Sequence, residues 1–384
     1  MNSQQREGRG SCVSILIGVI LIAVAVAAIV FGTGQRFLPF SKHSSPLGDD
    51  DVVQGIIGSE KAPFFDDPRV VDALADEGLR VEFTTAGSRS MAEKDLANYD
   101  FAFPSSSPTA DRISEAMPDN LGSVTPFYSP MAVATFEPIL QALQGAGAAR
   151  REGEHWYIDV AAFMELNAAR TRWRDVAPDY PNPRIVQIAS TDVRSSNSAA
   201  MYLAIVSWVA NGGAVPGSGE VLATVDRVRP LFVEQGYTER SSAGPFGDYL
   251  SQGIGSKPMV MVYEAQFLGE AMSKDSRIRE DMVLAYPDPT VHSNHTLVAL
   301  TESGRRLADV LNDDPELQQL AAEHGFRPHD PALFAEVLGK KGVEPPPEFL
   351  PAVDPPAFAT LEKLIEGVGM HYATAAPPEE GEQQ

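Results

Sequence analysis

The chain has 384 residues, of which 30 are Lys or Arg and 52 are Asp or Glu, so its formal net charge is −22 at pH 7. Because nucleic-acid binding requires a positively charged surface, this balance excludes nucleic acid as the main partner. Hydrophobic residues make up 43% of the chain, which excludes wholesale disorder and suffices for roughly two domains. The single cysteine, Cys12, excludes an intramolecular disulfide and a zinc site made of cysteines.

The first apolar segment, residues 12–31, contains no charged residue. A helix of this length is ~30 Å long, which matches the hydrocarbon core of a bilayer. A secretory signal has a shorter apolar stretch with a small-residue cleavage site, and the residues after this segment offer a poor one. We therefore expect a short tail (1–11), an uncleaved transmembrane anchor (12–31) and a polar linker (32–50). The flanking charges leave the orientation of the anchor open.

Strand and helix patterns alternate from Val52 onward. Apolar or alternating segments predict strands at 52–57, 79–83, 100–103, 131–135, 184–189, 258–262, 282–286 and 296–300. Helices are predicted between an Asp67 cap and Gly78, and at 156–173, 199–209, 264 onward, 303–325 and 356–369. Residues 373–384 predict a disordered tail.

This alternation predicts an α/β protein with largely parallel sheets, arranged as two doubly wound lobes with a ligand cleft between them. Lobe 1 is expected to comprise residues 51–135 and 293–372, and lobe 2 residues 136–292. Prolines flank β-rich runs at 125–137 and at 286–301, as hinge crossovers between two lobes would require.

Hydroxyl side chains are concentrated in the loops that follow the predicted strands, at 58–61, 84–90, 104–109 and 190–198. In an open α/β sheet, ligands bind beyond the carboxyl ends of the strands, where the free N–H groups of helix N-termini attract anions. Arg194 adds a two-pronged donor that suits an oxyanion. The alternative is structural, because Ser, Thr and Asn are the preferred N-caps and Arg194 could equally pair with a surface carboxylate.

Other candidate groups are fewer. Glu264 directly follows a predicted strand and either contacts a ligand or caps its helix. His292 and His295 have a metal-compatible spacing, but nearby prolines predict a loop there, so a structural role is favoured and no metal is expected. Because no nucleophile elbow, Walker motif or dinucleotide fingerprint is present, neither a cofactor nor an enzymatic activity is predicted.

Six segments, taken in chain order, resemble bacterial extracellular solute-binding proteins of the two-lobed class that includes phosphate, sulfate and molybdate binders. They are IIGSEKAPFF (56–65), VEFTTAGSRSM (81–91), DFAFPSSSPT (100–109), TDVRSSNSAAMYLAI (191–205), MVYEAQFL (261–268) and YPDPTVHSNHTLVALT (286–301). The resemblance covers about residues 52–330 and implies a type II periplasmic-binding-protein-like fold with two crossovers. It places in the cleft the residues Ser59, Ser105, Ser106, Arg194, Ser196, Asn197 and Ser198. Ala199 and Ala200 stand where a glycine and a threonine usually follow the phosphate-binding loop.

The resemblance also implies a function. We expect a single-pass, membrane-tethered protein whose soluble part lies outside the cytoplasm and closes on a small ligand, preferably an oxyanion, for uptake by a membrane permease of the ABC type. One alternative is an anchored sensor or interaction subunit that uses the same fold without transport. An extracytoplasmic hydrolase is the third hypothesis, and the sequence shows no assembled nucleophile and base for it.

Overall fold

The computed structural model of the chain describes residues 51–235 and 239–372. The predicted anchor (12–31), the linker and the C-terminal tail lie outside these ranges. Within them, no helix is both long enough and apolar enough to span a bilayer.

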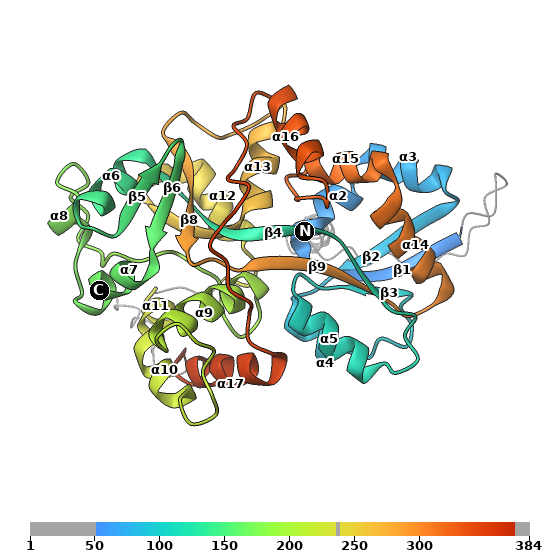
Figure 1. Ribbon diagram of the computed structural model, residues 1–384, viewed down its shortest axis with the longest axis horizontal. Coiled ribbons are helices and arrows are strands. Elements are labelled where there is room, and N and C mark those ends of the chain that lie inside the picture. Colours follow the sequence, from blue (N-terminus) through green and yellow to red (C-terminus); the bar gives the residue numbers. More distant parts are fainter. Residues whose placement is uncertain (1–50, 236–238, 373–384) are drawn as a thin grey trace, which may run out of the picture. The chain divides into compact units, whose positions relative to one another are not determined.

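The first sheet begins with the buried strand β1 (Asp51–Ile57), which runs parallel to β2 (Leu79–Thr85) and β3 (Phe101–Phe103). β3 pairs with β9 (His292–Ala299), and β9 pairs with β4 (Ser123–Phe136), both in antiparallel fashion. Helices cover both faces of this sheet (Figure 1). One face packs against α3 (Pro68–Asp76), α14 (Glu302–Asp313) and α15 (Pro315–Glu323), and the other against α4 (Ser88–Glu93) and α5 (Ser107–Ala116).

The second sheet uses the C-terminal half of β4, which pairs antiparallel with β7 (Met259–Tyr263) and β8 (Met282–Asp288). β8 runs parallel to β6 (His155–Asp159), which forms a hairpin with β5 (Ala149–Glu152). The largest hydrophobic cluster surrounds this sheet. The helices that contribute to this cluster include α6 (Glu137–Gly145), α7 (Val160–Ala168), α9 (Asn197–Ala210), α12 (Ala243–Gln252) and α13 (Glu264–Met272).

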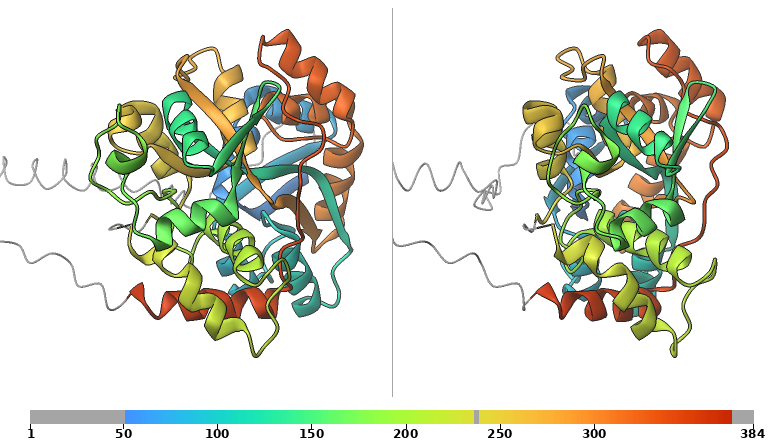
Figure 2. Two further views of the ribbon diagram at one scale, coloured as in Figure 1. Left: turned by 60° about the vertical axis from the view of Figure 1, so that its left-hand side comes forward. Right: turned by 90° about the vertical axis from the view of Figure 1, so that its left-hand side faces the viewer.

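β4 belongs to both sheets, so the strand order is continuous: β2-β1-β3-β9-β4-β8-β6-β5, with β7 also on β4. The segments predicted as crossovers coincide with β4 and with the stretch from the end of β8 through β9 (Figure 1). The predicted lobe boundaries stay a prediction. Helix α17 (Phe358–Gly369), which they assign to lobe 1, lies beside α10 (Val221–Val228), as both views of Figure 2 show; it also contacts α9 and α5.

The prediction of largely parallel sheets was wrong. Three of the eight strand pairings in the described residues are parallel and five are antiparallel. The reason is that β4 and β9 run opposite to the strands beside them, which accounts for four of the five antiparallel pairings; the fifth is the β5–β6 hairpin. The correct class is a mixed α/β fold.

Three local predictions were also wrong. The helix expected at 156–173 begins only at Val160, because the β-prone residues Trp156–Ile158 pair with β5 and β8 instead. The strand expected at 184–189 makes only isolated bridges, at Ile185 and Ala189. The loop expected at 292–295 is the start of β9, whose partner β4 supplies its hydrogen bonds.

The capping prediction for α3 was confirmed. The side chain of Asp67 accepts a hydrogen bond from the backbone N–H of Arg69, and Pro68 is the first helical residue. Gly78 then adopts a φ of +68°, a conformation that glycine takes without strain. Such local signals depend on neighbouring residues alone, which is why the sequence could reveal them.

Candidate functional site

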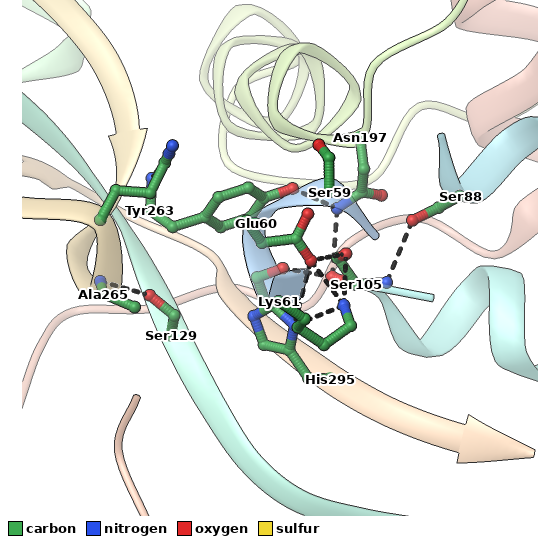
Figure 3. A network of polar contacts seen from close by, with 12 residues as sticks. Ser59, Glu60, Lys61, Ser88, Ser105, Ser129, Asn197, Tyr263, Ala265 and His295 are labelled. Atoms are coloured by element: carbon green, nitrogen blue, oxygen red, sulfur yellow. Dashed lines mark hydrogen bonds and ion pairs between the residues drawn. The ribbon is translucent and has the colours of Figure 1, made fainter. Parts of the chain in front are cut away.

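The candidate site lies where the loops after β1 and β3 meet the start of α9 and the end of β7 (Figure 3). Asn197, the first residue of α9, donates from Nδ2 to the Ser105 carbonyl at 3.1 Å and to the Tyr263 hydroxyl at 3.0 Å. One side chain therefore joins a loop of the first sheet to a strand of the second. We call the meeting point of Ser105, Asn197 and Tyr263 the junction.

Further contacts around the junction join its two sides, the loops and helices of the first sheet and those of the second sheet. Ser59 Oγ lies 3.2 Å from Ser241 Oγ. Arg89, on α4, donates to the Arg194 carbonyl at 3.1 Å and to Glu362 Oε2, on α17, at 2.7 Å. The pocket between these elements is small and is lined by Arg89, Thr109, Ser196, Asn197 and Glu362, among others. The two sides are thus already in contact in this structure.

A buried charged cluster lies directly beneath the junction, formed by Glu60, Lys61, Ser105 and His295; we call it the Glu60 cluster. Lys61 Nζ is 2.5 Å from Glu60 Oε1, 3.0 Å from Ser105 Oγ and 3.0 Å from His295 Nδ1. The Ser105 hydroxyl donates to the same carboxylate oxygen. The Lys61 and His295 side chains are fully buried, and only 7% of the Glu60 side chain is exposed.

The charge states of the cluster follow from burial and pairing. Burial opposes ionisation of Glu60, but the Lys61 ammonium and the His295 hydrogen bond outweigh it and hold the pKa of this carboxyl well below its usual range. Burial lowers the pKa of Lys61, and the Glu60 carboxylate opposes that change. Burial, assisted by the Lys61 charge, lowers the pKa of His295 to about 4. The cluster at neutral pH is therefore an ion pair beside a neutral imidazole.

Sequence reasoning missed Glu60, Lys61, His295 and Tyr263 as members of the site. A charged pair immediately after a buried strand was a usable signal, because few charges are tolerated there without a partner. His295 was missed because its segment was predicted to be a loop. In a strand, residues 293 and 295 share a face, and Ser293 indeed donates to the Ser105 carbonyl.

The same strand geometry explains the two histidines. Residues three apart in a strand point to opposite faces, so His292 and His295 cannot hold one metal together. His292 packs against Tyr128 with tilted rings whose centroids are 5.2 Å apart, whereas His295 packs against Phe326. Across residues 51–235 and 239–372, no group of three or more His, Cys, Asp or Glu side chains is placed to bind a metal ion.

The predicted serines divide into two sets. Ser59 and Ser105 lie at the junction or beside it, as described above. Ser106, Ser196 and Ser198 are buried, and each hydroxyl bonds to another hydroxyl: Ser106 donates to Thr109, while Ser196 and Ser198 lie 3.0 Å apart. Ser196 is the N-cap residue of α9, yet its side chain makes no capping bond. Capping is thus not the role of this hydroxyl.

Arg194 has a carboxylate partner in its own loop. Its guanidinium binds Asp192 through Nε and Nη2, the latter at 2.6 Å, and lies 4.6 Å from the centre of the Tyr372 ring. Arg194 thus pairs with a carboxylate, as the alternative interpretation predicted, but Asp192 is buried rather than at the surface. Lys61, rather than Arg194, places its charged group next to Ser105.

Glu264 lies away from the junction. It is fully buried, and its two oxygens accept from Arg327 Nε and Nη2, both at 2.7 Å, and from the Tyr286 hydroxyl at 2.7 Å. Tyr263 rather than Glu264 is the N-cap residue of α13. Glu264 thus neither caps its helix nor presents an oxygen at the surface.

Gly87 provides a test of how closely the two sides approach. A Cβ added at this position would collide with the carbonyl oxygen of Ser195, although the backbone, with φ −67°, accepts any residue. We therefore expect Gly87→Ala to hold the two sides apart. Ligand binding should weaken roughly tenfold, which corresponds to the free-energy cost of overpacking one side chain. Small-angle scattering and calorimetry measure both effects. Gly145→Ala is the control, since nothing lies within 4 Å of a Cβ there; equal behaviour of the two variants would contradict this prediction.

Comparison with known proteins supports the fold assignment. No protein-family model matches the chain. No curated protein matches it either. Among solved structures, the apo ferric ion-binding protein A of Pasteurella haemolytica is similar at 11% identity and a TM-score of 0.50, over 84% of this chain and 96% of that one. The periplasmic binding protein AfuA of Actinobacillus pleuropneumoniae, with exogenous fructose-6-phosphate bound, is similar at 9% identity and a TM-score of 0.51, over 84% and 99%.

These similarities show that the chain has the fold of the two-lobed extracellular solute-binding proteins, as its sequence motifs predicted. At such low sequence identities, the similarities show the fold and nothing about the ligand. The ligand class must be argued from the residues at the junction.

Proposed function

We propose that this chain is an extracytoplasmic solute-binding protein, tethered to the membrane by residues 12–31, that closes on a small ligand and delivers it to a membrane transporter. The observation that carries the proposal is the junction, where Asn197 bonds to groups from both sheets. Closure of two parts around a ligand, with no bond made or broken, is the physical event in such a protein. Catalysis is not part of the proposal.

The ligand class that we favour is a small oxyanion. The junction and the Glu60 cluster supply several donors: the Lys61 ammonium, the Asn197 amide and the Ser59 and Ser105 hydroxyls. Charge-assisted hydrogen bonds from such donors are the strong ones. The two similar proteins bear names that mention a ferric ion and fructose-6-phosphate, so one fold serves ligands of different chemistry, and the donors here favour the anion.

A second candidate function is an anchored sensor or interaction subunit that does not exchange a solute. The observation that favours it is the direct contact of the two sides through Asn197, Arg89 and Ser59, with a small pocket beside it. The two candidates differ in a measurable property, because only the first requires a saturable solute site.

Calorimetry of the full chain against phosphate, sulfate, molybdate, sugar phosphates and ferric ion tests the proposal. Saturable binding of an oxyanion, with compaction in solution scattering, is the expected result. Binding of ferric ion alone would overturn the ligand class, and binding of no solute, with nothing bound to the chain as purified, would favour the sensor.

Asn197→Ala should weaken solute binding by roughly tenfold, because it removes two hydrogen bonds worth about 1 kcal/mol each, part of which water replaces. Titration calorimetry gives the dissociation constants. Asn312→Ala is the matched control, since the Asn312 side chain bonds, within the part of the chain that the structure describes, to the neighbouring Asp313 and to His329 at the surface. An unchanged affinity in Asn197→Ala would place the ligand elsewhere.

A further inference from the structure

The carboxylate of Glu60 is bound in the way that a protein binds a small anion. Its Oε1 atom accepts from Lys61 Nζ at 2.5 Å and from the Ser105 hydroxyl, and it lies 3.4 Å from His295 Nδ1. All three partners are buried, and they come from three separate elements: the turn after β1, the loop after β3 and strand β9. Two of these partners, Lys61 and Ser105, are donors from distant parts of the chain, and together they form a built anion site.

Gly58 shows that the backbone makes room for this carboxylate. A Cβ at position 58 would collide with both Glu60 carboxylate oxygens and with Ser105 Oγ. The backbone of Gly58 has φ −66° and ψ 140°, which any residue adopts, so its conformation does not require glycine. The missing side chain at position 58 therefore leaves room for the Glu60 carboxylate.

The position of the carboxylate relates it to the proposed ligand site. Ser105 donates to Glu60 through its hydroxyl, while its carbonyl accepts from Asn197 (Figure 3). The same carbonyl also accepts from the Ser293 hydroxyl. Two of the donors that would bind an oxyanion at the junction, Lys61 and Ser105, are thus donors that Glu60 already uses.

We propose that Glu60 is an internal occupant of the anion subsite, so that an incoming oxyanion must displace its carboxylate from Lys61 and Ser105. This inference deepens the proposed function and rests on it. Two anions cannot share the same donors, because like charges at this separation in a buried site repel each other strongly. The Glu60 carboxylate competes with the ligand and restricts binding to anions that make stronger contacts.

Displacement rather than protonation is the way to empty the subsite. The pKa of Glu60 is held well below its usual range, so the carboxylate stays ionised at mildly acidic and neutral pH. An anion that enters would also satisfy the Lys61 ammonium, which would otherwise be left buried without a counter-charge.

The test removes the occupant. In Glu60→Ala, the Lys61 ammonium loses its partner, and we expect acetate or inorganic phosphate to restore the stability of the purified full chain in a saturable manner. The apparent affinity for these anions should be at least about tenfold higher than in the unsubstituted chain, because one charge-assisted hydrogen bond contributes a factor of that size to binding. Thermal unfolding and calorimetry at constant ionic strength measure the two effects.

Three further variants keep the result interpretable. Glu93→Ala removes one carboxylate from α4, where 65% of that side chain is exposed, and corrects for net charge and for general salt effects. Glu60→Ala combined with Lys61→Met removes the main donor and should abolish the anion response. Glu60→Gln, which preserves the volume of the side chain, replaces Glu60→Ala if that variant fails to fold, and it should show the same trend with a smaller gain.

The inference is overturned if Glu60→Ala, or Glu60→Gln in its place, responds to anions no more than Glu93→Ala does. It is also overturned if the variant without Lys61 responds equally. The outcome is separable from that of the proposed function. If the unsubstituted chain binds its solute but Glu60→Ala gains no anion site, the proposed function stands and the role of Glu60 as an internal occupant is rejected. If Glu60→Ala gains an anion site but the unsubstituted chain binds no solute, the role of Glu60 as an internal occupant stands and the proposed function is rejected.

Discussion

Replacing Arg327 with methionine should lower the free energy of unfolding by about 3–5 kcal/mol, because Glu264 would be left as a buried charge without a partner. The present pair is bidentate, with both nitrogen–oxygen distances at 2.7 Å, and Glu264 is fully buried. Arg327 follows α15, and Glu264 begins α13, so the pair joins segments of chain 63 positions apart. Urea unfolding gives the loss from the midpoint, provided that the slope is unchanged.

The matched control is Arg277→Met, which removes the exposed pair between Arg277 and Glu270. Such surface pairs contribute about 1 kcal/mol or less, so this variant should be nearly neutral. Adding Glu264→Gln to Arg327→Met removes both buried charges and should recover a substantial part of the stability. Similar losses in Arg327→Met and Arg277→Met would show that Glu264 does not depend on Arg327.

The same variants distinguish a structural role for Glu264 from the ligand-binding role that the sequence suggested. The combined Glu264→Gln and Arg327→Met variant should bind solute with an affinity within about twofold of the unsubstituted chain, since the loss of a direct charged contact would change it more than tenfold. Calorimetry provides the comparison. A tenfold or larger loss of affinity in a folded variant would return Glu264 to the ligand site.

Stability should also fall by about 2 kcal/mol between pH 7.5 and pH 5 because of His295. Burial lowers the folded-state pKa of His295 to about 4, below the value of about 6.5 expected for an unfolded chain. Between these two values the unfolded state binds a proton that the folded state does not, so the free energy of unfolding decreases as the pH falls. Most carboxyl groups titrate below this window.

His295→Asn removes the titrating ring and should flatten this part of the pH profile, measured by urea unfolding at several pH values. Burial also lowers the pKa of His292, so a smaller slope should persist. His329→Asn, at an exposed position, is the control and should follow the unsubstituted chain. A constant stability difference between His295→Asn and the unsubstituted chain across this range would mean that His295 titrates alike in the folded and unfolded states.

The candidate site could be predicted only in part. The order of the post-strand loops indicated that Ser59, Ser105 and the start of α9 belong together, and the structure places Asn197 on Ser105 although they are 92 positions apart. The sequence could not indicate that Arg194 binds Asp192 or that Glu264 binds Arg327, because a charged side chain selects its partner by three-dimensional proximity. His295 meets Glu60 and Lys61 only through the sheet, so its association with this pair could not be read along the chain.

The sequence by itself determined the features that depend on near neighbours. These include the Asp67 cap, the β1 and β7 strands, the α9 helix and the order of motifs that resembles a solute-binding fold. Only the tertiary structure decided the direction of strand pairing, the conversion of Trp156–Ile158 into a strand, and the burial of Glu60 with Lys61. The physical reason is that capping and hydrophobic periodicity act within a few residues, whereas strand pairing and charge burial depend on groups brought together by the fold.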